Sequence, residues 1–153
     1  MGGTMSFIEH LPVFNLSLGG LSTEFTMLAL AVVLGLFQLL IAARTGNSQR
    51  GLKWNVGARD APPPPVSAVA GRLERASRNF METFPFFAVT VILLALAGRH
   101  DRATVWGSEI YLAARIIYLP LYGFGVPGLR TLVWLIALLA IILLLAALFF
   151  PAI

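Results

Sequence analysis

The chain contains no cysteine, and only 12% of its 153 residues are charged. The absence of cysteine excludes disulfides, thiolate nucleophiles and cysteine-ligated metals. A soluble domain usually carries about 25% charged residues. Here 58% of the residues are hydrophobic, and several apolar runs are about as long as a bilayer is thick. The composition therefore predicts an integral membrane protein.

Lysine and arginine are also missing from the first 23 residues, where the ionisable side chains are Glu9 and His10. A cleaved signal peptide needs a positive flank before its apolar core, so we expect the first apolar run to be retained as a span. The net charge of +4 does not indicate nucleic-acid binding. The basic residues flank apolar spans and do not form a soluble basic face with aromatic stacking residues.

Hydropathy marks four candidate spans, at about residues 23–43, 73–97, 103–123 and 128–150. Lipid offers no hydrogen bonds to the backbone, so segments of this kind must be helical. We predict an all-α membrane protein, a four-transmembrane-helix bundle that forms a single domain over residues 1–153. The sequence offers no ligand cluster for a metal ion or a redox cofactor.

The connection at about residues 44–72 is the only long one. Counted through Arg78, seven of the eleven basic residues lie between the first and second spans. The positive-inside rule therefore places this loop in the cytoplasm and both termini outside. Within the loop, the run Pro62–Pro65 cannot be helical and predicts a short extended linker.

Polar side chains gather at the head of the second span. Positions i, i+3, i+4 and i+7 share one helix face, and the residues with this spacing are Arg75, Arg78, Asn79 and Glu82. A carboxylate inside an apolar run should face the bundle interior and pair with a cation. For Glu82 this cation is either Arg78 or an arginine of another helix. A snorkelling collar would explain the arginines alone, but the asparagine and the glutamate favour a functional site.

A second stripe, in the third span, consists of Arg115, Tyr118 and Tyr122. Arg115 lies about a dozen residues into the span, which is too deep for simple snorkelling. The tyrosines either place their hydroxyls in an aqueous cavity or belong to an interfacial aromatic belt.

The fourth span begins after a turn rich in glycine, and its first turn holds Arg130 and Thr131. Free backbone N–H groups and the helix dipole favour an anion at such a place, and Arg130 adds a full charge. A thiolate held there would have its pKa lowered by roughly one or two units. The alternative for Arg130 is a plain positive-inside flank.

Two segments together resemble the MAPEG family, the membrane-associated proteins in eicosanoid and glutathione metabolism. The first is GRLERASRNFMETFPFF, which contains an R-x-x-R-N-x-x-E pattern before proline and phenylalanine. The second is YLAARIIYLPLYGFGVPGLRTLVW, an Arg, Tyr, Tyr, Pro, Arg series. The segment NVGARD at residues 55–60 resembles the bacterial branch. The resemblance covers about residues 24–150.

The resemblance implies a homotrimer in the bacterial inner membrane, with glutathione sites between subunits on the cytoplasmic side. It is closest to the microsomal glutathione transferases. By this resemblance, the residues that would hold glutathione are Arg75, Arg78, Asn79, Glu82, Arg115, Tyr118 and Tyr122. Arginines suit its two carboxylates, and Glu82 suits its amino group. Arg130 and Thr131 would act at the thiol, and Gln38 and Arg44 are the first-span candidates.

We therefore expect a membrane enzyme with glutathione as co-substrate. It would transfer the thiolate to a lipophilic electrophile, or reduce a lipid hydroperoxide, and the second substrate would enter from the bilayer. The alternative is a non-catalytic membrane protein that binds an anionic lipid or metabolite in the same basic intersubunit pocket. A transporter is less favoured, because no pair of broken helices occupies inverted halves.

Overall fold

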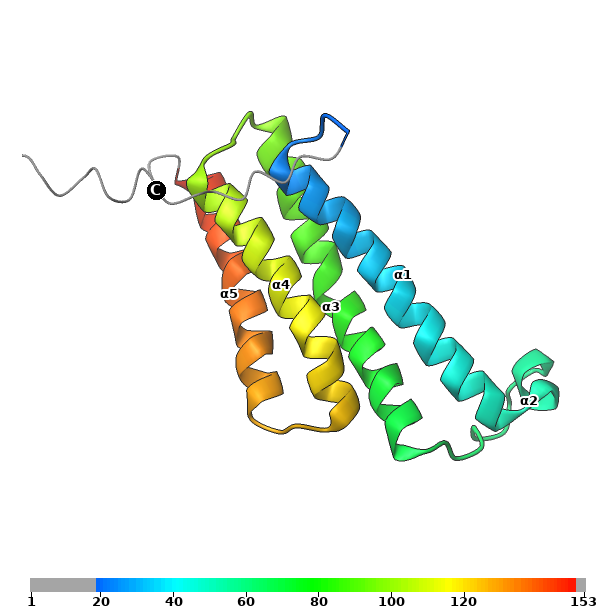
Figure 1. The fold of residues 1–153 in the computed structure, drawn as a ribbon. Coiled ribbons are helices and arrows are strands. Elements are labelled where there is room, and N and C mark those ends of the chain that lie inside the picture. The colour runs from blue at the N-terminus through cyan, green and yellow to red at the C-terminus, as the bar shows by residue number, and fades with distance from the viewer. Residues whose placement is uncertain (1–18, 151–153) are drawn as a thin grey trace, which may run out of the picture.

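The computed structural model describes residues 19–150 of the chain. Four long helices lie side by side, and a short fifth helix sits in the first connection (Figure 1). The helices are α1 (Thr23–Arg50), α2 (Leu52–Val56), α3 (Ala68–Leu96), α4 (Arg102–Phe124) and α5 (Leu129–Phe149). The described residues contain no strand, so the prediction of an all-α protein is confirmed. The expectations for the chain termini fall on residues outside the described range.

Three of these helices, α1, α3 and α5, are long and apolar enough to cross a membrane. The fourth long helix, α4, carries Arg102, Glu109 and Arg115, which lowers its hydropathy. Its role as the fourth span stays a prediction.

Helix ends differ from the predicted span ends around the first connection. Helix α1 continues to Arg50 and α3 already begins at Ala68, so the predicted loop at 44–72 is helical at both of its ends. The Ser67 hydroxyl caps α3 by accepting the Ala70 N–H at 3.3 Å. Hydropathy detects only the lipid-compatible part of a helix, whereas caps set its real ends. The run Pro62–Pro65 is non-helical, as predicted.

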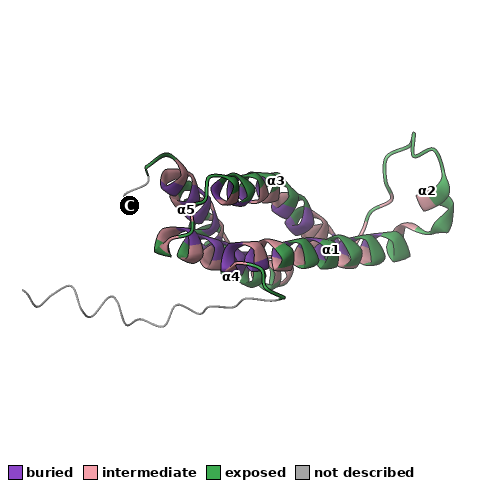
Figure 2. Ribbon diagram, turned by 90° about the horizontal axis from the view of Figure 1, so that it is seen from above, coloured by how far each residue is buried: buried purple, intermediate pink, exposed green. Residues whose placement is uncertain are grey.

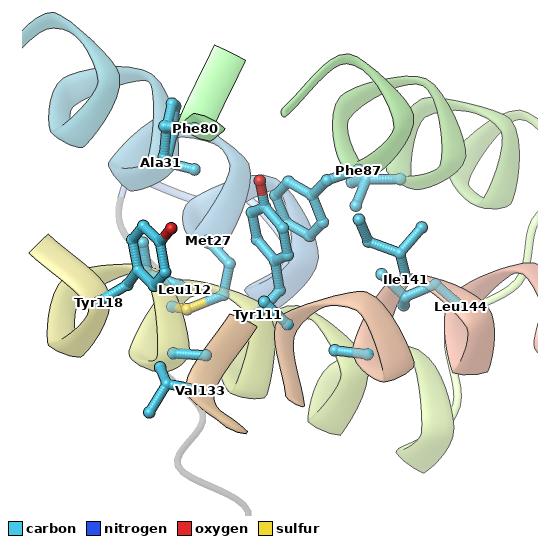
Figure 3. Close-up of a cluster of buried hydrophobic side chains, with 14 of the residues drawn as sticks. Met27, Ala31, Phe80, Phe87, Tyr111, Leu112, Tyr118, Val133, Ile141 and Leu144 are labelled. Carbon is cyan, nitrogen blue, oxygen red and sulfur yellow. The ribbon is translucent and has the colours of Figure 1, made fainter. Parts of the chain in front are cut away.

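The bundle has a simple packing order. Helix α1 packs on α3 and α4, and α5 packs on the same two helices. Buried residues face the space between the helices and exposed residues face outward (Figure 2). In the core, the rings of Phe87 and Tyr111 stack with centroids 3.9 Å apart (Figure 3). The outward faces carry exposed leucine, valine and phenylalanine, as expected where a helix meets lipid.

The packing of α4 against α5 depends on a glycine of α4. A Cβ added at Gly107 would lie 2.8 Å from two side-chain carbons of Leu144 in α5, and Leu144 is fully buried. A Cβ added at Gly123, further along α4, would meet Leu73 at an ordinary 3.7 Å. Gly107 therefore lets α4 and α5 pack without a clash.

We expect Gly107→Ala to be less stable than Gly123→Ala by about 1–3 kcal/mol, because overpacking costs that much. Gly123 lies in the last turn of α4, where alanine gains less helix propensity than at the interior position Gly107. A lower stability of Gly107→Ala must therefore come from the contact with Leu144. Thermal unfolding of the two variants in neutral detergent measures it. Equal midpoints would show that Leu144 moves aside freely.

The arrangement brings two polar regions to one end of the molecule. The α4–α5 turn and the α1–α3 connection lie at the same end of the bundle, opposite the α3–α4 connection (Figure 1). The head of α3 and the first turn of α5 therefore lie at one end.

Candidate functional site

A pocket of about 210 Å³ lies where α3, α4 and α5 meet at this end. Each of the three helices contributes polar side chains, and the lining residues are Asn79, Tyr118, Tyr122, Arg130, Thr131 and Trp134. Five of these six were candidates from the sequence. Residues of three helices, up to 55 positions apart in the chain (Asn79 and Trp134), are thus neighbours in one pocket.

Arg130 is held in place by an aromatic ring. Its guanidinium carbon lies 4.7 Å from the centroid of Tyr122, within the range of a cation–π contact. The Tyr118 and Tyr122 rings are 5.4 Å apart and tilted by 55°. The N-cap of α5 is Gly128, which makes no side-chain capping bond. The first N–H groups of α5 consequently lack a side-chain acceptor and add to the positive end of the pocket.

Arg115 supports the pocket from inside the bundle. Its side chain is only 1% exposed, and its Nη1 donates to Asn79 Oδ1 at 2.9 Å. Its Nη2 donates to Thr83 Oγ1. The same guanidinium lies 5.5 Å from the Tyr118 ring centroid. Arg115 thereby ties α4 to α3 and fixes which way the Asn79 amide points.

Asn79 also contacts Glu82, the acidic residue of the predicted α3 stripe. Asn79 Nδ2 donates to Glu82 Oε2 at 3.5 Å. Within residues 19–150, Glu82 forms no ion pair, with Arg78 or with any other arginine. The expected cation for Glu82 is therefore absent from the described part of the chain, and its carboxylate is exposed.

The predicted stripe on α3 is divided between two sides of that helix. Asn79 lines the pocket with Arg130, whereas Arg78 lines a different pocket beside α1 and α2. Arg75, Arg78 and Glu82 are all exposed. They stand at the outer edge of the bundle, free for a ligand or for another subunit.

The first-span candidates do not reach this pocket. Gln38 is 1% exposed, and its Oε1 has no hydrogen-bond partner in the described part of the chain. Arg44 lines a separate surface pocket on α1 and α2. Neither is placed near Arg130 by a single copy of the chain.

Two pocket or support residues were missed by the sequence reasoning. Trp134 lies four residues after Arg130, and Thr83 lies four residues after Asn79. Extending each stripe by one helical turn would have found both, since residues four apart share a helix face.

The pocket is rich in hydrogen-bond donors and holds one guanidinium and no carboxylate among its lining residues. This composition suits an anion. No group of three or more histidine, aspartate or glutamate side chains suited to a metal ion occurs in the described range.

Most of the chain matches the model of a known protein family. No curated protein matches the chain. The model of the MAPEG family matches residues 27–150, a range that includes nearly all of the four long helices and every residue lining the pocket. The match covers most of the chain, which therefore belongs to the MAPEG family.

Proposed function

We propose that the protein is a glutathione-dependent membrane enzyme that transfers the thiolate to lipophilic electrophiles or reduces lipid hydroperoxides. Family membership fits a glutathione-related membrane enzyme or a role in lipid metabolism. The observation that carries the finer proposal is the position of Arg130. It lies in the first turn of α5, in one pocket with Thr131, Tyr118 and Tyr122.

The pocket can stabilise a sulfur anion. A free thiol has a pKa of about 8.5, and a nearby cation or a helix N-terminus lowers it. Arg130 supplies the cation, and the uncapped start of α5 supplies N–H groups. The Thr131 hydroxyl can donate a further hydrogen bond. The thiolate then attacks the electrophilic carbon, forming the C–S bond as the leaving group departs with its electron pair.

The remaining charges match those of glutathione, which carries two carboxylates and one ammonium group. Arg75 and Arg78 can bind carboxylates, and Glu82 can bind the amine. The pocket of about 210 Å³ is smaller than the roughly 300–1,000 Å³ typical of ligand sites. We therefore propose that a homotrimer completes the site, with a neighbouring subunit covering the exposed edge of α3. In this proposal the site faces the cytoplasm of a bacterial cell.

Glutathione binding tests the proposal directly. Isothermal titration of the purified protein in neutral detergent is expected to show binding at millimolar or lower concentrations. Conjugation to 1-chloro-2,4-dinitrobenzene, followed by absorbance, is expected on the same sample. Ophthalmate, which has a methyl group in place of the thiol, should bind without reacting. If glutathione does not bind at millimolar concentration, the proposal is wrong.

A further inference from the structure

A second pocket, of about 490 Å³, lies on the other side of α3, between α1, α2 and α3. Helix α3 separates this pocket from the pocket of Arg130. Arg78 of α3 lines this second pocket, whereas Asn79 lines the pocket of Arg130. None of its α1 and α2 residues belongs to the proposed glutathione site. The pocket has a polar end and an apolar end, and each points to a different part of a ligand.

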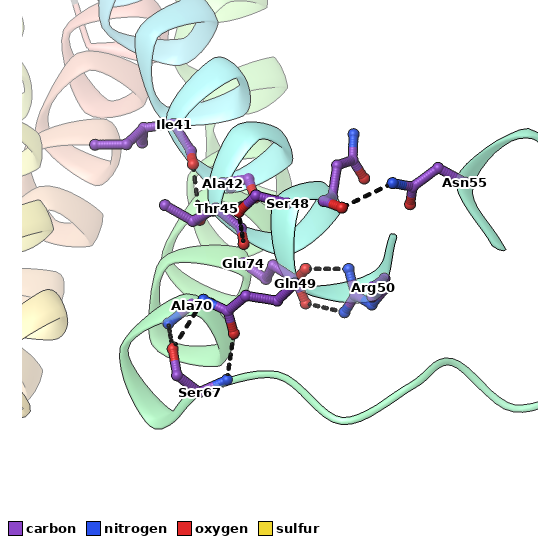
Figure 4. Close-up of polar contacts among 11 residues, drawn as sticks. Ile41, Ala42, Thr45, Ser48, Gln49, Arg50, Asn55, Ser67, Ala70 and Glu74 are labelled. Atoms are coloured by element: carbon purple, nitrogen blue, oxygen red, sulfur yellow. Dashed lines mark hydrogen bonds and ion pairs between the residues drawn. The ribbon is translucent and has the colours of Figure 1, made fainter. Parts of the chain in front are cut away.

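The polar end is built on an ion pair (Figure 4). Arg50 donates to both carboxylate oxygens of Glu74, at 2.5 and 2.8 Å. The Arg50 guanidinium carbon also lies 5.4 Å from the Trp54 ring centroid, and that of Arg59 lies 5.0 Å from it. The indole ring of Trp54, which lines the pocket, is thus held in position by its contacts with two guanidinium groups.

Two donors in this wall have no acceptor. Trp54 Nε1 and Arg50 Nε are buried, and within residues 19–150 neither has a hydrogen-bond partner. Buried N–H groups in folded proteins are almost always paired. Two such groups on residues lining one pocket indicate an acceptor that a ligand would supply.

The charge at this end favours an anionic acceptor. Arg50 and Glu74 neutralise each other. Arg78 lines the same pocket, is exposed, and forms no ion pair with any described residue. Its charge, with that of Arg59 on Trp54, is left uncompensated. A carboxylate or a phosphate would satisfy both the charge and the free donors.

The other end of the pocket is apolar and lies deeper along the bundle. It is lined by Leu39, Ala42 and Ala43 of α1 and Met81 of α3. At about 1.5 Å per residue, α1 rises roughly 16 Å from Leu39 to Arg50. The small side chains of the two alanines leave room for an alkyl chain at this end of the pocket.

We propose that this pocket binds an anionic amphiphile. The carboxylate or phosphate head lies against Trp54 and Arg78, and the alkyl chain runs along Ala43 and Met81 toward the bilayer. A fatty acid and an anionic bilayer lipid share this chemistry. This site and the proposed glutathione site share Arg78 and no other named residue, so the tests avoid substitutions at Arg78.

Isothermal titration of the purified full-length protein in neutral detergent tests whether the ligand needs both an anionic head and an alkyl chain. We expect oleate to bind once per chain, at least tenfold more tightly than oleyl alcohol or inorganic phosphate. Oleyl alcohol binding as tightly as oleate would overturn the charged end. Phosphate binding as tightly would overturn the apolar end, and no oleate binding would overturn the site.

Nanodiscs then identify the source of the amphiphile. Oleate is titrated into the protein in phosphatidylcholine discs with and without phosphatidylglycerol. Weaker apparent oleate binding in the phosphatidylglycerol discs supports a bilayer lipid as the occupant. Equal binding in the two discs supports a free fatty acid.

Variants locate the binding in this pocket. Trp54→Phe removes the indole donor and keeps a ring beside Arg50, and is expected to weaken oleate binding by about tenfold. Ala43→Phe fills the apolar end and should abolish binding. Val33→Phe, at an exposed α1 position outside the pocket, should change nothing. Glutathione binding is expected to be unchanged in all three, so the two proposals fail separately. Unaltered oleate affinity in both Trp54→Phe and Ala43→Phe would refute the assignment.

Discussion

An Arg130→Ala variant is expected to lose turnover by about 100- to 1,000-fold, while its affinity for glutathione falls far less. This loss is the usual cost of removing one donor that stabilises developing or reactive negative charge. Arg130 is the only guanidinium among the residues lining the pocket of Thr131 and the two tyrosines. The carboxylates of glutathione would still have Arg75 and Arg78.

The pH dependence of the variant distinguishes thiolate stabilisation from other roles of Arg130. Arg130 favours the charged thiolate, so it lowers the pKa of the bound thiol. Without it, the pKa rises by about one or two units. The rising limb of kcat against pH, measured at saturating glutathione, then moves to higher pH by the same amount. Part of the lost activity should therefore return at high pH.

Arg130→Lys serves as the matched control, since it keeps the charge and loses the planar contact with Tyr122. Its turnover should lie between the wild type and alanine. A different outcome favours the non-catalytic alternative: no turnover in the wild type, together with loss of ligand affinity in Arg130→Ala. Full activity in Arg130→Ala would show that the thiolate lies elsewhere.

The fold was predictable because long apolar runs and the hydrogen-bonding demand of the backbone leave few options. Hydropathy located the four long helices but not the ends of α1 and α3. Those ends depend on the Ser67 cap and on polar residues that continue a helix beyond lipid. The oligomeric state does not follow from periodicity, because lipid-facing and subunit-facing leucines are equally apolar.

The part of the site on α4 and α5 could be predicted better than the part on α3, whose candidate residues line two different pockets. Helical spacing grouped Tyr118 with Tyr122, and the family resemblance added Arg130 to the same site. The structure has all three in one pocket. Successive residues of a helix are about 100° apart. Arg78 and Asn79 are therefore the two margins of one stripe, and α3 turns them toward different neighbours. Spacing within one helix does not say where the neighbouring helices lie.

The second large effect is expected at Arg115, which we regard as a positioning residue. Its guanidinium is buried and holds Asn79 and Thr83, and no carboxylate forms an ion pair with it in the described part of the chain. A buried charge without an ion-pair partner costs desolvation energy. Methionine removes that cost, which offsets the loss of the two hydrogen bonds. Arg115→Met should therefore stay folded.

Glutathione binding, by contrast, should weaken about 10- to 100-fold in Arg115→Met, because a hydrogen bond to a charged group contributes about 1.5–3 kcal/mol. Asn79 would be free to turn its amide away from Glu82, whose carboxylate it now contacts. Thr83→Val is the matched control, since it removes the other partner of Arg115 and leaves Asn79 bound. Its affinity should change by less than about threefold.

Two measurements on each variant separate positioning from simple support of the bundle: the titrated glutathione affinity and the thermal unfolding midpoint in detergent. A positioning role predicts a large change in affinity for Arg115→Met with a nearly constant midpoint. A structural role predicts a lower midpoint in Arg115→Met and Thr83→Val alike, with affinity following stability. Wild-type affinity in a folded Arg115→Met protein would show that Asn79 keeps its orientation without the guanidinium. The hydrogen bond from Arg115 to Asn79 would then contribute nothing to glutathione binding.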